Sequence, residues 1–191
     1  PGQAGAYTRI NVQNTTTLYY YCTQHSGMGG QADQNATYGS TNFDGSILSK
    51  VSANTTAGFS TVTWTGNGTG GATIGHGLGA VPELMIVKKR SGTDNWAVYH
   101  HKMASDPQTD YINLDGDGAR SDSVDRWNDT APTSTVASLG DAGAVNGSSA
   151  TYVGYFFTSI KGYSKFGSYN GNNNADGTFV YTGFKPAFII L

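Results

Sequence analysis

The sequence predicts an all-β protein built around an antiparallel β-sandwich of the jelly-roll type. Three observations support this fold class. Charged residues make up only 13% of the 191 residues, whereas Gly is frequent (27) and Tyr (12) outnumbers Phe and Trp combined. Short runs of β-branched and aromatic residues alternate with Gly- and Asn-rich turns. No window sustains the 3.6-residue period of an amphipathic helix.

The N-terminal part of the chain is expected to form a separate small β unit over residues 1–32. Its strongest strand candidate is Thr17–Cys22, where aromatic and β-forming residues follow one another. Residues 33–56 are dominated by Asn, Gly, Ser and Thr. We therefore expect a linker or an extended arm, anchored on a neighbouring surface by Phe43 and the Ile47–Leu48 pair.

Residues 57–191 are expected to form the sandwich module, truncated at its C-terminal end. Thr151–Ile160 is the longest strand candidate, and aromatic residues crowd both of its faces, which favours a central strand covered on both sides. A brief helical turn is expected near Ser123–Asn128. The other expected strands are Phe59–Thr65, Leu84–Lys89, Trp96–His100, Tyr111–Asn113, Thr135–Leu139, Lys165–Tyr169, Thr178–Thr182 and Ala187–Leu191.

A segment near the middle of the chain recurs imperfectly at its C-terminus. Both copies contain a Gly–aromatic–Ser start, an Asn/Gly turn and a Gly-x-x-Pro motif, and both enter an apolar run. The runs are Leu84–Val87 and Phe188–Leu191. Such a recurrence predicts a modular β protein and a piece of a longer polypeptide. It also allows two pseudo-symmetric halves of one sandwich, with Phe188–Leu191 paired beside or opposite Leu84–Val87.

The most specific motif for a metal is Cys22, His25 and Met28, which directly follows an aromatic strand. It resembles the C-terminal copper loop of the cupredoxins, and residues 1–32 would then be the C-terminal part of a cupredoxin-like β unit. The resemblance implies a thiolate, an imidazole and a weak axial thioether as copper ligands. The second His ligand of that family has no counterpart upstream of Cys22. Either copper binds only in a fuller protein, or the loop is a copper-free relic in which Cys22 is a buried apolar residue.

Aromatic residues beside Asn- and Asp-rich loops suggest a second kind of site, for carbohydrate. Trp64, Trp96 and Trp127 are the main candidates for stacking on sugar rings, with Tyr163 and Tyr169 as further ones. The alternative is that these rings fill the core of the sandwich. Their exposure distinguishes the two interpretations, since burial of the three Trp residues counts against sugar binding.

Other chemistry has weaker support in the sequence. Asp115 and Asp117 lack the further ligands of an EF-hand, so a pair of Asp-Gly turns is expected, with a looser calcium loop as the alternative. His100 and His101 are expected to face opposite sides of a strand. No Gly-x-Ser-x-Gly motif is present, and Glu83 is the only Glu, so we expect no enzyme activity, with a polysaccharide depolymerase as the remaining enzymatic alternative.

The net charge of −2 gives no reason to expect a nucleic-acid partner. No apolar run approaches the roughly 20 residues of a membrane span, so no membrane partner is expected either. We also expect no cofactor apart from the copper that a fuller protein would bind.

From Asn54 onward the sequence resembles β-rich modules in virion proteins of tailed bacteriophages, especially marine ones. The resemblance rests on Thr56–Ser60, Thr65–Gly68, Gly75–Leu78, Trp127–Thr133, Tyr163–Tyr169 and Tyr181–Phe184. It implies a non-enzymatic structural component of the virion: a tail fibre, a spike or a capsid decoration protein. Its implied partners are other virion proteins, further copies of itself in a homotrimer, and a host surface glycan.

Two alternatives to this function remain open. One is a carbohydrate-binding module for host recognition. The other is a secreted bacterial surface protein with a copper-binding cupredoxin domain, which copper analysis of the full-length protein would test.

Overall fold

The computed structural model describes residues 17–21, 29–33 and 39–191 of the chain. The chain divides into two compact units, Pro1–Ser40 and Thr41–Leu191. In the first unit, β1 (Thr17–Tyr21) pairs antiparallel with β2 (Gly29–Asp33), and Thr17 lies opposite Asp33. This confirms the strand expected at residue 17. No helix in the described ranges is long and apolar enough to span a membrane.

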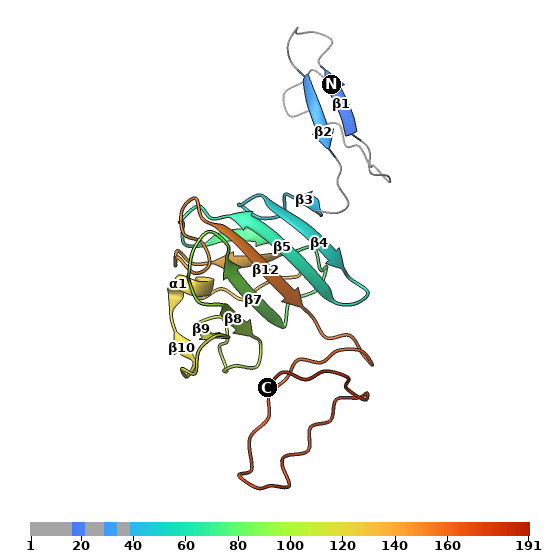
Figure 1. The fold of residues 1–191 in the computed structure, drawn as a ribbon, viewed down its shortest axis with the longest axis vertical. Helices are drawn as coiled ribbons and strands as arrows, with labels where there is room; N and C mark the ends of the chain where they lie inside the picture. The colour runs from blue at the N-terminus through green and yellow to red at the C-terminus, as the bar shows by residue number, and fades with distance from the viewer. Residues whose placement is uncertain (1–16, 22–28, 34–38) are drawn as a thin grey trace. The chain divides into compact units, whose positions relative to one another are not determined.

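The second unit is built on one eight-stranded sheet, and apart from one short helix its regular secondary structure is β (Figure 1). The order of strands is β10-β9-β8-β7-β12-β5-β4-β3. All pairings from β10 through to β4 are antiparallel. The bounds are β3 (Ser40–Asn42), β4 (Ser49–Asn54), β5 (Phe59–Thr65), β7 (Leu84–Lys89), β8 (Ala97–His100), β9 (Asp110–Asn113), β10 (Ser121–Asp122) and β12 (Thr151–Phe157).

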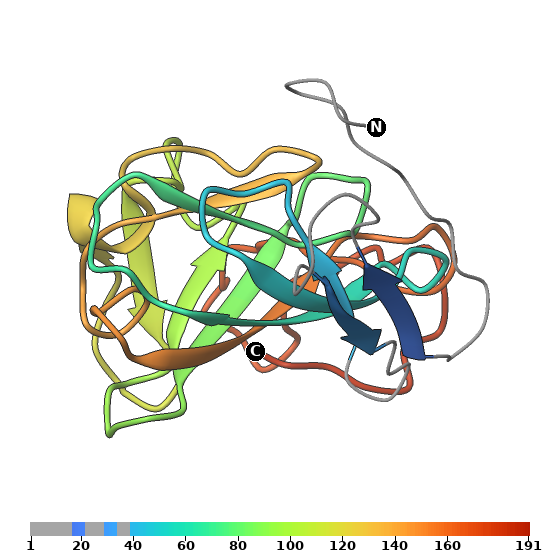
Figure 2. The same cartoon turned by 90° about the horizontal axis from the view of Figure 1, so that it is seen from above.

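A second layer covers one face of this sheet. It consists of the antiparallel pair β6 (Ala72–Gly75) and β11 (Val136–Leu139), together with loops and the short helix α1 (Val124–Trp127). Figure 2 shows β6 and β11 as a layer apart from the large sheet. The core between the layers includes Val62, Trp64, Met85, Trp127 and Phe156. The all-β sandwich is therefore confirmed.

The alternation of side chains explains why these residues form strands. In β5 and β12, every second residue is buried, as expected for strands with one face on a core. Tyr152 lies opposite Trp64 and their rings stack with centroids 5.4 Å apart. β12 is the central strand, since it bonds to β5 on one side and β7 on the other.

The segment expected as a linker or arm, residues 33–56, differs from that expectation. β4 pairs with β5 along its whole length, from Ser49 opposite Trp64 to Asn54 opposite Phe59. Ile47 is buried in the core and bridges to Ile74, whereas Phe43 and Leu48 are exposed. The prediction of a linker is wrong because most polar residues of β4, namely Lys50, Ser52 and Asn54, lie on its exposed side, while Ser49 and Val51 are buried. The sheet therefore includes residues that precede the expected start at 57.

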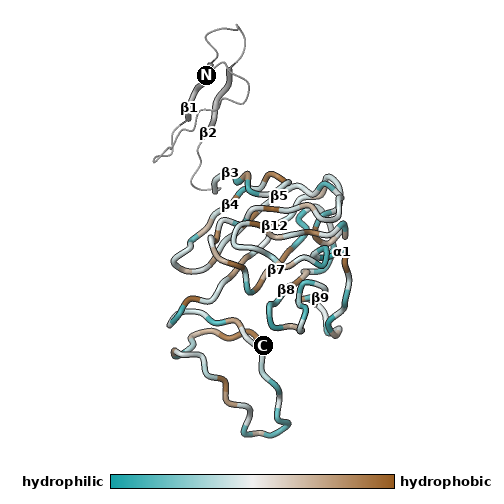
Figure 3. Tube along the Cα trace, turned by 180° about the vertical axis from the view of Figure 1, so that it is seen from behind, coloured by the Kyte–Doolittle hydropathy of each residue, from teal (hydrophilic) through white to brown (hydrophobic). Residues whose placement is uncertain are grey.

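The prediction of three strands near the C-terminus, Lys165–Tyr169, Thr178–Thr182 and Ala187–Leu191, is wrong. From residue 165 to 191 the chain forms no strand, and β12 itself ends at Phe157 rather than Ile160. Phe188–Leu191 does not lie beside β7, because both edges of β7 are already taken by β12 and β8. In Figure 1 this segment runs away from the sheet as an extended loop, and Figure 3 shows apolar and polar stretches along it.

Candidate functional site

The face of the large sheet that turns away from the second layer is rich in apolar side chains. We call it the outer sheet face. Its partly exposed apolar residues alternate with the buried ones on β5, β7 and β12, and Trp96 just before β8 joins them, whereas Val98 on β8, opposite Ile86, is buried. The partly exposed residues are Phe59, Leu84, Ile86, Trp96, Val153, Tyr155 and Phe157. Residues on neighbouring strands line up across it. Tyr155, for example, lies opposite Ile86 on β7 and Thr61 on β5.

Three rings on the outer sheet face are almost parallel. The centroids of Phe59 and Tyr155 are 6.5 Å apart with an interplanar angle of 8°, and those of Tyr155 and Trp96 are 6.5 Å apart with an angle of 13°. Phe157 packs against Phe59 at 4.9 Å. The face thus presents a continuous row of aromatic rings that crosses β5, β12 and the start of β8.

Polar groups border this aromatic row. On β4, next to Phe59 and β5, Lys50, Ser52 and Asn54 are exposed. At the other border, the Lys88 ammonium lies 5.7 Å from the centre of the Trp96 ring and donates to the Asp94 carbonyl oxygen. Such an arrangement, apolar in the centre and polar at the rim, is typical of a surface that binds a partner.

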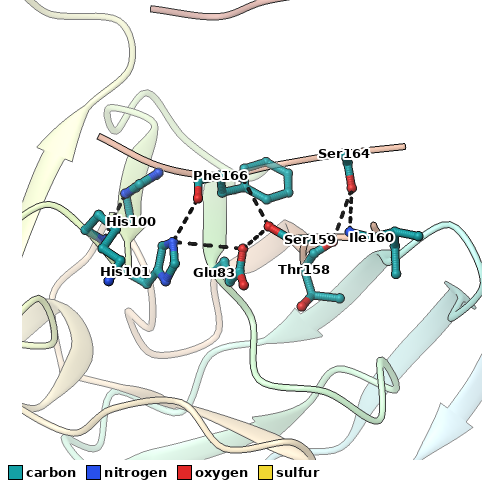
Figure 4. A network of polar contacts seen from close by, with 9 residues as sticks. Glu83, His100, His101, Thr158, Ser159, Ile160, Ser164 and Phe166 are labelled. Carbon is teal, nitrogen blue, oxygen red and sulfur yellow. Dashed lines mark hydrogen bonds and ion pairs between the residues drawn. The ribbon is translucent and has the colours of Figure 1, made fainter. Parts of the chain in front are cut away.

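A hydrogen-bond network fixes the chain that follows β12 at one end of the outer sheet face (Figure 4). Ser159 Oγ donates to Glu83 Oε2, and the backbone N–H of Phe166 donates to Ser159 Oγ at 3.2 Å. His101 Nε2 donates to the Phe166 carbonyl oxygen at 3.1 Å and lies 3.9 Å from Glu83 Oε2. The ring of Phe166 packs on Phe157 at 5.7 Å.

This network is suited to anchoring rather than to nucleophilic catalysis. A nucleophile needs the imidazole as its base, with the carboxylate behind the imidazole. Here the carboxylate of Glu83 lies between Ser159 and His101, and the N–H of His101 is directed to a backbone carbonyl. The group therefore holds residues 159–166 against β7 and the end of β8.

The expectation that His100 and His101 face opposite sides is wrong. Their ring centroids are 5.2 Å apart, because β8 ends at His100 and the alternation of a strand stops there. The Nδ1 atom of His100 accepts the Lys102 backbone N–H at 3.0 Å. Burial, and then the neighbouring His101, lower the pKa of His100.

The three Trp candidates for sugar stacking lie in different surroundings. Trp64 is buried and donates its indole N–H to the Val145 carbonyl oxygen at 3.2 Å. Trp127 is buried and donates to the Asp110 carbonyl oxygen at 3.0 Å. Both rings are thus core residues and are closed to a ligand. Trp96 alone of the three lies on the outer sheet face, half-buried beside Tyr155.

The copper candidates Cys22, His25 and Met28 lie outside the described residues. Within the ranges that the structure describes, no cluster of three or more His, Cys, Asp or Glu side chains is placed to hold a metal ion. Asp115 accepts the Trp96 backbone N–H at 3.0 Å, so its carboxylate fixes the loop that carries Trp96.

The buried His76 gives a prediction on the pH dependence of stability. Its Nε2 donates to the Thr133 carbonyl oxygen at 3.1 Å and its Nδ1 accepts the Leu78 N–H, and burial lowers its pKa from 6.5. In the unfolded chain this histidine takes up a proton below pH 6.5, whereas in the fold it stays neutral to lower pH. The free energy of unfolding should therefore fall as the pH drops below 6.5, by at most about 1.4 kcal/mol per pH unit for each such histidine.

Urea titrations of the full chain from pH 7.5 to 5 will measure this effect. His100, whose pKa is also lowered, should contribute in the same direction. His76→Gln should reduce the slope, since one group no longer titrates. A free energy of unfolding that rises on acidification would contradict the neutral, buried state of His76.

Sequence reasoning missed Phe59, Ile86 and Tyr155 as members of a surface. The aromatic crowding of β12 predicts cover on both faces, yet Val153, Tyr155 and Phe157 on its outer face stay partly exposed, with Phe166 packed on Phe157 at one end. The sequence did contain a signal for this surface. β12 is apolar at odd as well as even positions, so apolar side chains must lie on both faces of the sheet.

Comparison with known proteins gives a family without an assigned role. A family model described as "Domain of unknown function (DUF7483)" matches residues 32–191. The chain belongs to the DUF7483 family. No curated protein and no solved structure matches it. The DUF7483 region contains the whole sandwich and the C-terminal segment after β12, so these parts belong to one family domain.

Proposed function

We propose that this DUF7483 protein is a non-enzymatic structural component of a tailed-bacteriophage virion, as a fibre, spike or capsid decoration protein, and that its subunits assemble through the outer sheet face. The observation that carries the proposal is the row of partly exposed aromatic and aliphatic side chains on that face. Large apolar patches on soluble β proteins mark interaction surfaces.

Three further features support this proposal. The resemblance of residues 54–191 to phage virion modules gives the class of particle. The low share of charged residues and the abundance of Ser, Thr and Asn suit an exposed, protease-resistant surface outside a cell. A homotrimer, the assembly favoured for such fibres, buries the same patch on each subunit through a closed symmetry. The partners are then other virion proteins and further copies of the chain.

Association should depend on the centre of the outer sheet face. Ile86→Glu places a charge among Tyr155, Val98 and their neighbours without entering the core, since Ile86 is partly exposed. We expect self-association to weaken about tenfold or more, because an unpaired charge is costly to bury in an interface. Sedimentation velocity over a range of protein concentrations will measure this.

Val124→Glu, at an exposed apolar residue of α1 in the second layer, is the matched control and should change association little. Far-UV circular dichroism will check that both variants keep the fold. A chain that is monomeric at all concentrations, or an Ile86→Glu variant that associates like the unaltered chain, would contradict the proposed interface.

A second candidate function is carbohydrate binding in host recognition. It is favoured by the nearly parallel rings of Phe59, Tyr155 and Trp96 beside Asp94 and other polar groups. In this case Trp96→Ala should abolish binding to a glycan array, whereas Phe43→Ala, at an exposed aromatic outside that face, should not. An array without any bound glycan would reject this candidate.

A further inference from the structure

The Asn-Gly pairs of the chain lie in different surroundings. They are Asn67-Gly68, Asn146-Gly147 and Asn170-Gly171. In such a pair the glycine nitrogen can attack the side-chain amide of the asparagine, because glycine has no Cβ to hinder the close approach of its backbone. The attack needs a glycine N–H that is free to lose its proton and an asparagine side chain that is free to turn. Hydrogen bonds and burial therefore decide which pair reacts.

The first pair, Asn67-Gly68, is held in a turn by hydrogen bonds. The Gly68 N–H donates to the Asn146 carbonyl oxygen at 2.8 Å. Asn67 Oδ1 accepts the Thr69 N–H at 2.9 Å and an N–H of Asn146 Nδ2 at 3.1 Å. The attacking nitrogen and the side-chain amide of this pair are thus both bonded, although the two residues are exposed. The pair reacts only when these bonds open together.

The second pair, Asn146-Gly147, is held more firmly because its asparagine is fully buried. Asn146 Nδ2 donates to Asn67 Oδ1 and to the Thr69 carbonyl oxygen, the latter at 3.0 Å, and Asn146 Oδ1 accepts the Asn67 N–H at 3.0 Å. The Gly147 N–H donates to the Tyr152 hydroxyl oxygen at 2.7 Å. Reaction here requires the loop to leave the core, so it is slow in the folded protein.

The third pair, Asn170-Gly171, lies in the C-terminal segment without these restraints. Both residues are exposed and outside any strand or helix. Among the described residues, no hydrogen-bond partner is found for the Gly171 N–H or for the Asn170 side-chain amide. A Cβ at Gly171 would meet no atom within 4 Å. The pair therefore has both the free groups and the room that the reaction needs.

We propose that Asn170 is a site of spontaneous deamidation in this protein, whereas the fold protects Asn67 and Asn146. A base takes the amide proton of Gly171 as its nitrogen attacks Asn170 Cγ. The new N–Cγ bond closes a succinimide ring, the bond from Cγ to the side-chain nitrogen breaks, and that nitrogen takes up a proton and leaves as ammonia. Water then opens the ring. Its addition at Cγ gives Asp, and its addition at the backbone carbonyl carbon gives isoaspartate.

The modification changes the charge and the backbone of the C-terminal segment. Either product adds one negative charge to a chain whose formal net charge is −2. In residues 167–191 the only other charged side chains are Asp176 and Lys185. Isoaspartate also takes the Asn170 carbonyl oxygen, which accepts from Thr178 Oγ1 at 2.6 Å, out of the main chain. The loop that this bond closes must then rearrange.

The test follows the three pairs in the full chain by tryptic peptide mapping and mass spectrometry during incubation at mildly alkaline pH. Conversion appears as the mass gain of an amide that becomes an acid, and fragment ions locate it. We expect Asn170 to react about tenfold or more faster than Asn67 and Asn146, because rare local opening slows a reaction in proportion. The rate at Asn170 should rise with pH, since a base takes the amide proton. In urea the three rates should become similar.

Two glycine substitutions in the same loop provide matched variants. Gly171→Ala places a methyl group beside the attacking nitrogen and should slow conversion of Asn170 severalfold. Gly177→Ala, where a Cβ also meets no atom within 4 Å, should leave that rate unchanged. Both positions are exposed and outside the strands, so far-UV circular dichroism should show the same fold for both variants.

Three results would overturn this proposal. Conversion of Asn67 or Asn146 as fast as Asn170 in the folded chain would show that their hydrogen bonds do not protect them. An Asn170 that stays unconverted in the folded chain, while the pairs react in urea, would show that its amide is restrained by the fold. Equal slowing by Gly171→Ala and Gly177→Ala would contradict attack by the Gly171 nitrogen.

Discussion

Replacing Trp64 with Ala is expected to lower the free energy of unfolding by about 3–5 kcal/mol, the largest loss among the substitutions considered. Trp64 lies in the core, where its ring stacks on Tyr152 and lies so close to Gly154 that a Cβ there would come within 3.0 Å of it. The change leaves a cavity between β5 and β12, and it also leaves the Val145 carbonyl oxygen without the indole donor. Urea denaturation followed by far-UV circular dichroism will measure it.

Two companion variants separate the causes of that loss. Trp64→Phe keeps a ring and loses the hydrogen bond, so about 1–2 kcal/mol is expected. Trp96→Ala removes a ring of the same type from the outer sheet face and should cost clearly less than Trp64→Ala. An equal loss of unfolding free energy for Trp64→Ala and Trp96→Ala would contradict the assignment of Trp64 to the core and Trp96 to the outer sheet face.

Gly140→Ala is expected to destabilise the fold by about 3 kcal/mol or more. A Cβ at this position would lie 2.1 Å from the backbone carbon and oxygen of Asp125. The backbone must therefore shift, and the Gly140 N–H would lose its 2.8 Å bond to the Arg126 carbonyl oxygen. Because α1 carries Trp127, the shift would also disturb the core.

Gly118→Ala is the matched control for this prediction. No atom lies within 4 Å of a Cβ at Gly118, and the residue is exposed in a loop. Its effect should stay within about 0.5 kcal/mol. The same urea titration serves both variants, and a Gly140→Ala chain as stable as the Gly118→Ala chain would show that α1 and β11 are not in close backbone contact.

The sequence predicted the centre of the fold well, for a physical reason. Strands such as Phe59–Thr65 and Leu84–Lys89 are rich in the aromatic, aliphatic and β-branched residues that favour strands, and alternate residues of each are buried in the core. The helical turn near residue 124 was also confirmed. Local pattern and tertiary pairing agree in these elements. The prediction failed for β4, where most residues are polar and only Ser49 and Val51 are buried.

The prediction of strands near the C-terminus is wrong for the opposite reason: the sequence favours strands, but the pairing is missing. Their local pattern is that of strands, yet a strand needs a neighbour to bond to, and residues 165–191 have none. Sequence periodicity reports what a segment is suited to form. It does not report whether the partner strand is available, so β propensity alone could not predict this outcome.

The candidate site was predictable only in part. Of the three Trp residues singled out, Trp96 lies on the outer sheet face, while Trp64 and Trp127 are in the core. A buried and an exposed aromatic look alike in a sequence whose strands are apolar on both faces. Phe59 and Tyr155 join Trp96 through cross-strand register, which depends on how β5, β12 and β8 are arranged in the sheet.

The most direct test of the central claim is immunogold electron microscopy of purified phage particles with an antibody raised against this chain. The particles come from a phage whose genome encodes the protein, and an antibody against the major capsid protein is the control. We expect gold at a regular position on the tail or the capsid of intact particles. Particles that bind only the control antibody, while the protein is found free in the lysate, would contradict a structural role in the virion.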